Sequence, residues 1–247
     1  MKSVLITGAA GGLGRIICKE LNHYGYKVIA TDFKKSDYLK EMEIEFIKSD
    51  LNFIVNNKLE LEKFKKKVIS ILGNNELYAI INNAAFQKVE KFEKITIEDW
   101  NYTLSVNLLA PIILSKTFLE ELKTNRGTII NISSIHSSLT KQEFSCYATS
   151  KAALTGLTKS LAIELGKNIR VNAIEPAAID TDMLRQGFQK SQKLIRELEK
   201  FHPSEIIGNP IDICNAVLFL LDPTNKFLNG SILQIGGGIH HRLHDPF

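Results

Sequence analysis

Short apolar runs rich in β-branched residues alternate with longer segments of helical periodicity along most of the 247-residue chain. This alternation is typical of a parallel sheet with helices on both faces, because a strand buried on both sides reads as a continuous apolar run. No linker or internal repeat interrupts the pattern, so residues 1–247 are predicted to form a single doubly wound α/β domain with about seven strands. The expected strands are 3–7, 27–31, 45–48, 78–82, 128–132, 170–173 and 232–235, and the expected helices lie near 12–24, 57–72, 97–123, 146–166 and 210–221.

The composition and charge exclude several classes of protein. A hydrophobic content of 44% and a charged content of 23% are ordinary for a globular chain. The net charge of +4 is modest, and lysines alternate with glutamates in stretches such as 60–67, so no nucleic-acid partner is expected. The apolar run at the start is too short for a signal peptide, and no segment approaches the ~20 apolar residues of a membrane span.

The cysteines indicate a reducing compartment. Cys18, Cys146 and Cys214 are odd in number and lack a C-x-x-C spacing, which argues against a disulfide framework and against a zinc knuckle. We therefore expect a soluble, cytoplasmic protein that contacts neither a membrane nor a structural metal.

A glycine-rich turn follows the first expected strand and precedes the first expected helix. Glycines have no Cβ, so the backbone can approach a diphosphate closely, and the free N–H groups of the helix start point at the anion. The spacing Gly-x-x-x-Gly-x-Gly differs from the commoner G-x-G-x-x-G, and a glycine turn without a ligand is the alternative. The residues predicted to hold a dinucleotide phosphate here are Gly8, Gly11, Gly12, Leu13 and Gly14.

Asp32 closes the second expected strand, 24 residues after Gly8. A carboxylate at this place accepts hydrogen bonds from ribose hydroxyls and repels a 2′-phosphate, which favours NAD over NADP. An aspartate that caps a helix is the alternative. Lys34 and Lys35 could attract a phosphate, so NADP stays open as the less favoured cofactor.

Ligands of doubly wound sheets bind at the carboxyl ends of the strands. Polar or small residues follow every central strand of this chain, although strand ends that merely meet solvent are also polar. They are Thr31 and Asp32, Ser49 to Leu51, Asn82 to Ala85, Ser133 and Ser134, and Glu175 and Pro176.

Tyr147 and Lys151 are four residues apart in a helical stretch, so their side chains share one helix face. A nearby ammonium stabilises a phenolate and lowers the phenol pKa from its ordinary value near ~10, which would allow acid or base catalysis near neutrality. Ser134 follows the fifth strand, where its hydroxyl could donate to a substrate oxygen. Ser133 is the alternative if the register differs, and a turn serine is the structural alternative.

Asn107 lies four residues before Pro111 in the predicted helix 97–123. Because proline has no N–H, an α-helix here would leave the Asn107 carbonyl without its partner and would kink. Water or a ligand would then have to satisfy that oxygen. A kink that serves only helix packing is the alternative.

Taken together, these motifs resemble those of the short-chain dehydrogenase/reductases, in the shorter single-domain subgroup with a Rossmann-like fold. The motifs match in order over essentially the whole chain. They are Thr7-Gly8-x-x-x-Gly12-x-Gly14, Asn82-Asn83-Ala84, Asn107, Ser134, Tyr147-x-x-x-Lys151, and Pro176 with Thr181.

The resemblance implies a role for each of four residues. Tyr147 would be the catalytic acid or base, and Lys151 would lower its pKa and hold the nicotinamide ribose. Ser134 would orient the substrate carbonyl, and the carbonyl of Asn107 would anchor a water in a proton relay to Lys151.

The same resemblance implies the remaining cofactor contacts and an oligomer. Homotetramers or homodimers would form through the helices near 97–123 and 146–166. The implied contacts are Asp50 and Leu51 for adenine, Asn83 and Ala84 for a ribose, and Ile179 and Thr181 for the nicotinamide amide. Two positions depart from the family pattern, because Ala85 and Ala177 stand where it usually has glycine, so we expect slightly reshaped loops after strands four and six.

Residues 182–202 form the least sheet-like part of the chain and are predicted to be a lid over the substrate. His136 is expected to contact the substrate together with Ser134 and Tyr147. A small, hydroxylated, sugar-like substrate suits the mixed polar and aromatic residues expected around it. These are Phe86, Gln87, Gln142 and Phe144.

The chain ends in a histidine-rich tail, 236–247, which contains His240, His241, His244 and Asp245. We favour a tail that packs on its own subunit or on a neighbour over a metal site. The sequence as a whole predicts an NAD-dependent oxidoreductase that moves a hydride between nicotinamide and a secondary alcohol or ketone. The alternatives are an NADP-dependent carbonyl or 3-oxoacyl reductase and, from another class, a non-catalytic NAD-binding sensor or scaffold, which would not need the four catalytic residues.

Overall fold

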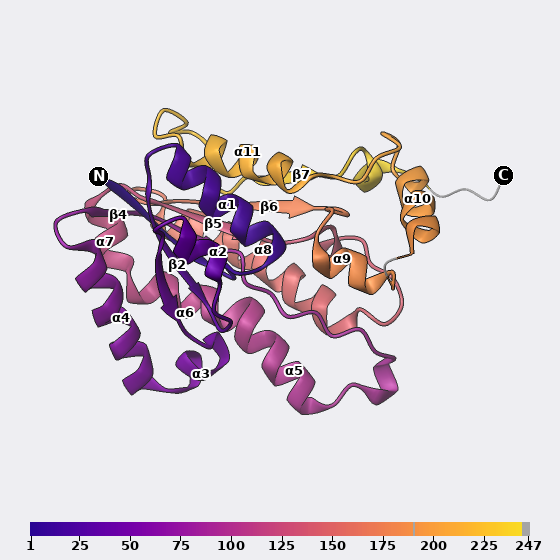
Figure 1. The fold of residues 1–247 in the computed structure, drawn as a ribbon, viewed down its shortest axis with the longest axis horizontal. Helices are drawn as coiled ribbons and strands as arrows, with labels where there is room; N and C mark the ends of the chain where they lie inside the picture. Colours follow the sequence, from indigo (N-terminus) through magenta and orange to yellow (C-terminus); the bar gives the residue numbers. More distant parts are fainter. Residues whose placement is uncertain (190, 244–247) are drawn as a thin grey trace.

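The structure is a computed structural model that describes residues 1–189 and 191–243. Over these residues its centre is one seven-stranded sheet with the strand order β3-β2-β1-β4-β5-β6-β7 (Figure 1). Every neighbouring pair is parallel, as the alternating pattern predicted. The strands are β1 (Lys2–Thr7), β2 (Lys27–Asp32), β3 (Glu45–Lys48), β4 (Glu76–Asn82), β5 (Thr128–Ile132), β6 (Arg170–Pro176) and β7 (Ile232–Ile235).

Helices connect the strands and cover both faces of the sheet (Figure 1). The short helices α2 and α3 were not expected from the sequence, and α9 and α10 lie in the predicted lid. The α-helices are α1 (Gly12–His23), α2 (Asp37–Glu41), α3 (Leu51–Asn56), α4 (Lys58–Leu72), α5 (Ile97–Leu104), α6 (Ala110–Thr117), α7 (Leu119–Thr124), α8 (Ser145–Leu165), α9 (Asp182–Gly187), α10 (Gln192–Phe201) and α11 (Pro210–Leu221). Short 3-10 turns are η1 (Phe92–Lys94), η3 (Ile135–Ser137) and η4 (Ile239–His241), and η2 (Ser105–Leu109) is a π-helical turn.

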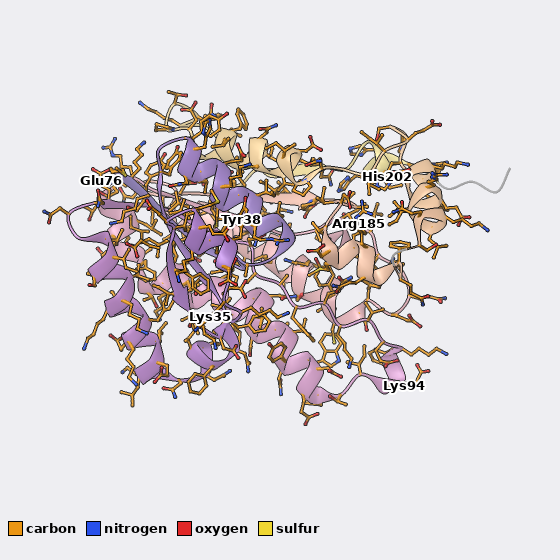
Figure 2. The ribbon with its side chains drawn as sticks, in the orientation of Figure 1. Lys35, Tyr38, Glu76, Lys94, Arg185 and His202 are labelled. Atoms are coloured by element: carbon orange, nitrogen blue, oxygen red, sulfur yellow. The ribbon has the colours of Figure 1, made fainter. Side chains whose placement is uncertain are left out.

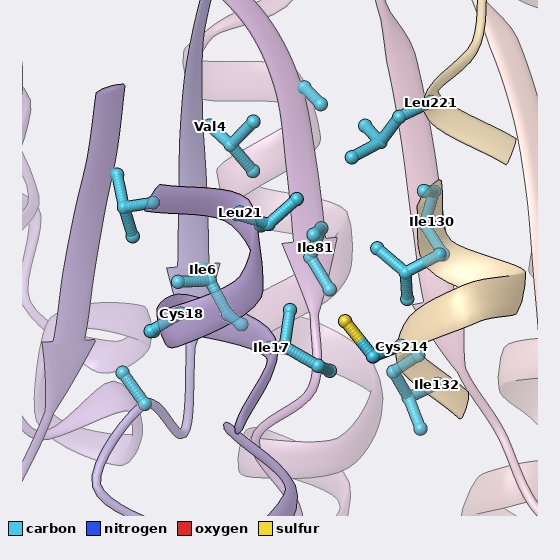
Figure 3. Packing of buried hydrophobic residues seen from close by; sticks show 14 of the residues in the cluster. Val4, Ile6, Ile17, Cys18, Leu21, Ile81, Ile130, Ile132, Cys214 and Leu221 are labelled. Atoms are coloured by element: carbon cyan, nitrogen blue, oxygen red, sulfur yellow. The ribbon is translucent and has the colours of Figure 1, made fainter. Parts of the chain in front are cut away.

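Two apolar cores hold the sheet between its helices, because alternate residues of a strand point to opposite faces. On one face Ile6 and Ile130 pack with Ile17 of α1 and Cys214 of α11 (Figure 3). On the other face lie Leu5, Ile29, Ile80 and Ile129 with Phe64 of α4 and Leu114 of α6. Each fully buried side chain of this size contributes about 1.5–3 kcal/mol, so the cores fix where the strand ends lie.

The predicted continuous helix 97–123 is wrong in its middle. The chain forms α5, then the π-helical turn η2, then α6 and α7. The N–H of Ala110 donates to the carbonyl of Ser105, five residues back, and Pro111 lies in the first turn of α6. A proline is tolerated there because an N–H in the first turn has no partner in its own helix. Instead of a kinked α-helix, a widened turn therefore carries Asn107.

Candidate functional site

The turn between β1 and α1 requires glycine at two positions, Gly8 and Gly14. Gly8 has a φ of +66°, and a Cβ on it would lie 2.7 Å from the Cα of Ala84. A Cβ on Gly14 would lie 2.1 Å from the carbonyl oxygen of Gly8. The backbone of the turn therefore packs directly on the start of α1, whose N-cap is Gly11.

Hydrogen bonds join this turn to the loop after β4. The Thr7 hydroxyl oxygen accepts from the N–H groups of Asn83 and Ala84 at 3.1 and 3.0 Å. The Asn83 side chain donates to the carbonyls of Thr7 and Gly8, both at 3.0 Å. Two of the residues predicted to line a ribose thus lie against the glycine turn. Neither Ala85 nor Ala177 has a positive φ, so alanine fits at both departures from the family pattern.

Asp32 is fixed at the edge of the turn. Its side chain is buried, and its two oxygens accept from the N–H of Ala10 at 2.9 Å and the N–H of Lys34 at 3.0 Å. It is not a helix cap, because Ser36 caps α2. The carboxylate is thus held beside the place where the chain turns around Gly8.

Of the other residues predicted to contact a cofactor, two are helix caps. Asp50 caps α3 through a bond from the N–H of Asn52 at 2.9 Å, and Leu51 is buried behind it. Thr181 caps α9, and its side chain lies 3.2 Å from the place of a Cβ on Gly12. The loop after β6, which includes the buried Ile179, therefore reaches the glycine turn.

Tyr147 and Lys151 lie on one face of α8, beside the end of β5. The Lys151 ammonium donates to the carbonyl of Ile132 at 2.7 Å and lies 5.6 Å from the centre of the Tyr147 ring. Burial lowers the pKa of Lys151 to about 7. The lysine is therefore held under the tyrosine by the sheet itself.

The expected lowering of the Tyr147 pKa is not found. Burial raises the pKa of this phenol, and the hydrogen bond with Ser134 opposes the rise only in part. The helix spacing was correct, but the sequence could not show that neighbouring elements partly bury the phenol. A positive charge placed close to the phenol would favour the phenolate and so lower this pKa.

The structure also decides between the two serines after β5. The Ser133 hydroxyl points to α8, where it bonds to the carbonyl of Lys151 at 3.1 Å and to the hydroxyl of Thr155 at 2.9 Å. Ser134 instead bonds to Tyr147 and accepts from the N–H of His136 at 3.2 Å. Ser134 therefore faces the phenol, as the favoured register predicted.

Asn107 uses its side chain to hold the loop after β4. Its amide oxygen accepts from the N–H of Phe86 at 2.7 Å, and its amide nitrogen donates to the Phe86 carbonyl at 2.9 Å. The nitrogen also donates to the hydroxyl of Ser150 at 2.9 Å, which in turn donates to the carbonyl of Tyr147 at 2.7 Å. Sequence reasoning missed Ser150, although it precedes Lys151 directly. What marks Ser150 is its complete burial in the second turn of α8, which the sequence does not show.

Aromatic rings form a wall next to Tyr147. The His136 ring stacks on Phe144 at 4.5 Å between centres and stands edge-on to Tyr147 at 5.7 Å. Its Nδ1 bonds to the hydroxyl of Thr140 at 3.0 Å. Burial, and then the charge of Lys141, lower the pKa of His136 to about 4, so the ring is neutral at neutral pH. Of the other residues expected in this wall, Gln87 is half-buried and Gln142 is exposed.

Helices α9 and α10 lie together beyond the carboxyl ends of β6 and β7 (Figure 1), and Arg185 and His202 lie at that end while Glu76 lies at the other (Figure 2). Arg185 pairs with Asp180 through two bonds of 2.6 Å. An ion pair of 3.1 Å joins Arg15 of α1 to Asp182 at the start of α9. The predicted lid is thus joined at its first residue to α1, the helix that follows the glycine turn.

The described part of the tail, residues 236–243, packs on its own chain. Arg242 donates to the carbonyls of Lys200 and Phe201 at the end of α10, at 3.2 and 2.6 Å. His240 and His241 form the turn η4, and His244 and Asp245 lie outside the described residues. Within residues 1–189 and 191–243 no three His, Cys, Asp or Glu side chains are grouped to hold a metal ion.

These residues fit a dinucleotide. A Cβ on Gly8 or Gly14 would collide with neighbouring backbone atoms, the buried Asp32 offers carboxylate oxygens, and Tyr147 and Lys151 lie on α8 beside the end of β5. One edge of the sheet thus joins a phosphate cradle, a ribose acceptor and an acid-base pair.

Comparison with known proteins identifies the family. Residues 8–240 match the family described as Enoyl-(Acyl carrier protein) reductase. The chain belongs to the short-chain dehydrogenase/reductase family. The 3-oxoacyl-[acyl-carrier-protein] reductase of Rickettsia bellii is 32% identical over 96% of this short-chain dehydrogenase/reductase and 96% of its own length. L-Xylulose reductase of Caenorhabditis elegans is 31% identical over 96% and 95% of the two chains.

Solved structures of other members share the fold. The ligand-free aldohexose dehydrogenase of Thermoplasma acidophilum has a TM-score of 0.90 and 30% identity over 100% of this chain and 97% of its own. A 4-hydroxyisoleucine dehydrogenase with NADH has a TM-score of 0.87 and 28% identity, covering 97% and 98%. ElxO with NADP has a TM-score of 0.87 and 25% identity, covering 98% and 99%.

This short-chain dehydrogenase/reductase is therefore an NAD(P)-dependent oxidoreductase that acts on CH-OH groups. In the part of the chain that the structure describes, none of the helices has the length and apolar character needed to span a membrane.

Proposed function

We propose that this enzyme uses NAD to interconvert a secondary alcohol and a ketone in a small hydroxylated, sugar-like substrate. The observation that carries the proposal is that Ser134, Tyr147 and Lys151 lie together beside the end of β5. The same sheet carries the buried Asp32 at the end of β2. Nicotinamide C4 would supply or accept the hydride. The residues of the chain would transfer the proton and orient the substrate.

In this mechanism the Tyr147 hydroxyl exchanges a proton with the substrate oxygen. Ser134 donates a hydrogen bond to the same oxygen, and Lys151 would hold the nicotinamide ribose. Because burial raises the pKa of the Tyr147 phenol, the phenolate depends on positive charge brought next to it. The carbonyl of Asn107, in a π-helical turn, would anchor the water that renews the proton through Lys151.

The neutral His136 ring supports a hydroxylated substrate. With a pKa lowered to about 4, His136 carries no charge at neutral pH, and its Nδ1 is already bonded to Thr140. A neutral imidazole both donates and accepts hydrogen bonds, which suits substrate hydroxyls. Aldohexose dehydrogenase and L-xylulose reductase, two similar proteins, carry the names of sugar substrates.

Asp32 supports NAD. Its two oxygens each accept one backbone N–H and keep further lone pairs for ribose hydroxyls, whereas a 2′-phosphate would meet a fixed negative charge. Lys34 and Lys35 favour the second candidate, an NADP-dependent carbonyl or 3-oxoacyl reductase. A calorimetric titration with NADH and with NADPH at one ionic strength decides between them.

We expect NADH to bind at least about tenfold tighter, a difference of about 1.4 kcal/mol. Tighter binding of NADPH would favour the reductase, and binding of neither would refute the dinucleotide site. Activity is then assayed on D-glucose, L-xylulose, 4-hydroxyisoleucine and a 3-oxoacyl thioester. Cofactor binding without turnover of any of them would favour the non-catalytic sensor or scaffold.

Two further proposals concern the assembly of the chain and the segment that covers the substrate. We propose a cytoplasmic homotetramer or homodimer that forms through α5 to α7 and α8. Ile163 of α8 is 86% exposed, as an interface residue would be in an isolated chain.

Residues 182–202 are proposed to close over the substrate. Limited proteolysis of this segment with and without NAD and substrate tests the lid, since protection is expected only when both are bound.

A further inference from the structure

Glu175 is a buried carboxylate at the end of β6 to which the mechanism above gives no task. Its side chain is 2% exposed. Among the described residues it forms no ion pair, although buried carboxylates are usually paired with a cation. Two hydroxyl groups bond to it instead, and its charge also acts on the ring of His240, outside ion-pair distance.

One oxygen of Glu175 bonds to both elements that carry the catalytic residues. Its Oε1 accepts from the hydroxyl of Ser137 at 2.5 Å and from the hydroxyl of Thr155 at 2.7 Å. Ser137 ends the turn η3, which Ser134 caps. Thr155 lies on α8, one helical turn beyond Lys151 and two beyond Tyr147, so the three side chains share a helix face.

The hydrogen bonds continue from Thr155 to Ser133 and the carbonyl of Lys151, and the donor of each bond can be assigned. A carboxylate only accepts, so Thr155 must donate its single hydroxyl proton to Glu175. Thr155 can then only accept from Ser133, so the single hydroxyl proton of Ser133 is shared between the Thr155 oxygen at 2.9 Å and the carbonyl oxygen of Lys151 at 3.1 Å. The carboxylate thus orients the buried hydroxyls between β5, β6 and α8.

We propose that Glu175 is a positioning residue that holds the turn η3 against α8 and thereby sets the distance between Ser134 and Tyr147. Hydrogen bonds to a charged acceptor are stronger than neutral ones, so this carboxylate adds a strong link between η3 and α8 to the neutral bonds that Ser133 and Ser134 make with α8. The inference rests on the proposed function for its catalytic consequence. Its structural part, the restraint on η3, can be tested without a substrate.

The test compares Glu175→Ala and Glu175→Gln with the matched control Asn229→Ala. Asn229 also joins β6 to α8, because its side chain accepts from the N–H of Val171 and donates to the carbonyl of Ala162, both at 2.8 Å. It lies at the other end of β6, away from Ser134. A variant that only loosens the packing of β6 on α8 should therefore resemble Asn229→Ala.

Hydrogen exchange of the amides of residues 133–139 is measured first, at a temperature where all variants are folded. Glu175→Ala should exchange about tenfold faster there, and Asn229→Ala should exchange like the wild type. The substrate with the highest rate in the panel is then used for kinetics. Glu175→Ala should lower kcat about tenfold with little change in KM and in NADH affinity, and Glu175→Gln, which keeps an acceptor oxygen, should restore part of it.

Unchanged exchange in Glu175→Ala would overturn the inference, whatever the activity. Loss of stability in Glu175→Ala with wild-type kcat would also overturn it, because the residue would then be structural only. Faster exchange in an enzyme that turns over no substrate would support the restraint on η3 while refuting the proposed function.

Discussion

The two halves of the candidate site are built by different means. At the end of β1 the geometry comes from the backbone, since Gly8 and Gly14 lie where a Cβ would overlap neighbouring main-chain atoms. At the end of β5 it comes from side chains, as Asn107 and Lys151 each bond to a backbone carbonyl of another element. We therefore expect the first half to be disrupted by substitutions that add a Cβ, and the second by substitutions that remove a hydrogen bond.

This difference follows from what each half must do. A diphosphate is recognised by backbone N–H groups, which require only close approach. A proton must be exchanged at one oxygen, which requires a side chain of defined pKa at a defined place. The following predictions test whether the two halves respond to substitution as differently as their construction implies.

The largest effect is expected from Tyr147→Phe. Without the phenol no group can exchange the proton, so kcat should fall about 10³-fold or more, while NADH affinity stays nearly unchanged. Steady-state kinetics and NADH titration measure the two quantities. Tyr24→Phe, at a position that is 61% exposed, is the control. Retained turnover in Tyr147→Phe would refute its role.

The two serines after β5 provide a matched pair. Ser134→Ala should lower kcat/KM about 10²-fold, because the substrate oxygen loses a donor. Ser133→Ala removes only bonds to α8 and should cost about 1 kcal/mol of unfolding free energy with little change in kcat/KM. Equal kinetic losses in both variants would contradict the assignment of Ser134 to the substrate side.

In the backbone-built half, Gly14→Ala should be damaging. Its Cβ would lie 2.1 Å from the Gly8 oxygen, so the turn must open, and we expect a loss of about 3 kcal/mol in unfolding free energy with weaker NADH binding. Gly187→Ala, where a Cβ meets nothing within 4 Å, should change both quantities little. Urea unfolding and NADH titration of both variants check this, and normal binding by Gly14→Ala would show that the cradle is not needed.

The smallest effect concerns the pH dependence of stability. The pKa of Lys151 is about 7 in the folded chain and 10.5 in water. Between these two values Lys151 is protonated in the unfolded chain and neutral in the folded chain. The free energy of unfolding therefore rises as the pH increases from 7 towards 10.5, and this gain is lost as the pH falls back to 7. From pH 7 to 9, the unfolding free energy of the wild type should gain about 2 kcal/mol relative to Lys151→Met.

Urea unfolding across this pH range measures the difference. Lys159→Met, on the exposed side of the same helix, should keep the wild-type dependence. Parallel curves for the wild type and Lys151→Met would show that burial does not lower the pKa of Lys151.

The sequence alone determined the sheet and most of the chemistry. Buried parallel strands need continuous apolar runs, so the seven runs predicted the seven strands, and spacing placed Tyr147 and Lys151 on one helix face. Gly8 and Gly14 could be read because a close backbone approach leaves room only for glycine. These features involve residues that are close together in the sequence, so a local sequence pattern is enough to predict them.

Only the tertiary structure decided the rest. Whether Ser133 or Ser134 faces the phenol depends on how β5 meets α8, and the raised pKa of Tyr147 depends on how deeply neighbouring elements bury it. The π-helical turn at Asn107 and the bonds of Glu175 join segments far apart in the chain. Burial and long-range hydrogen bonds are properties of the assembled elements, and no stretch of sequence contains both partners.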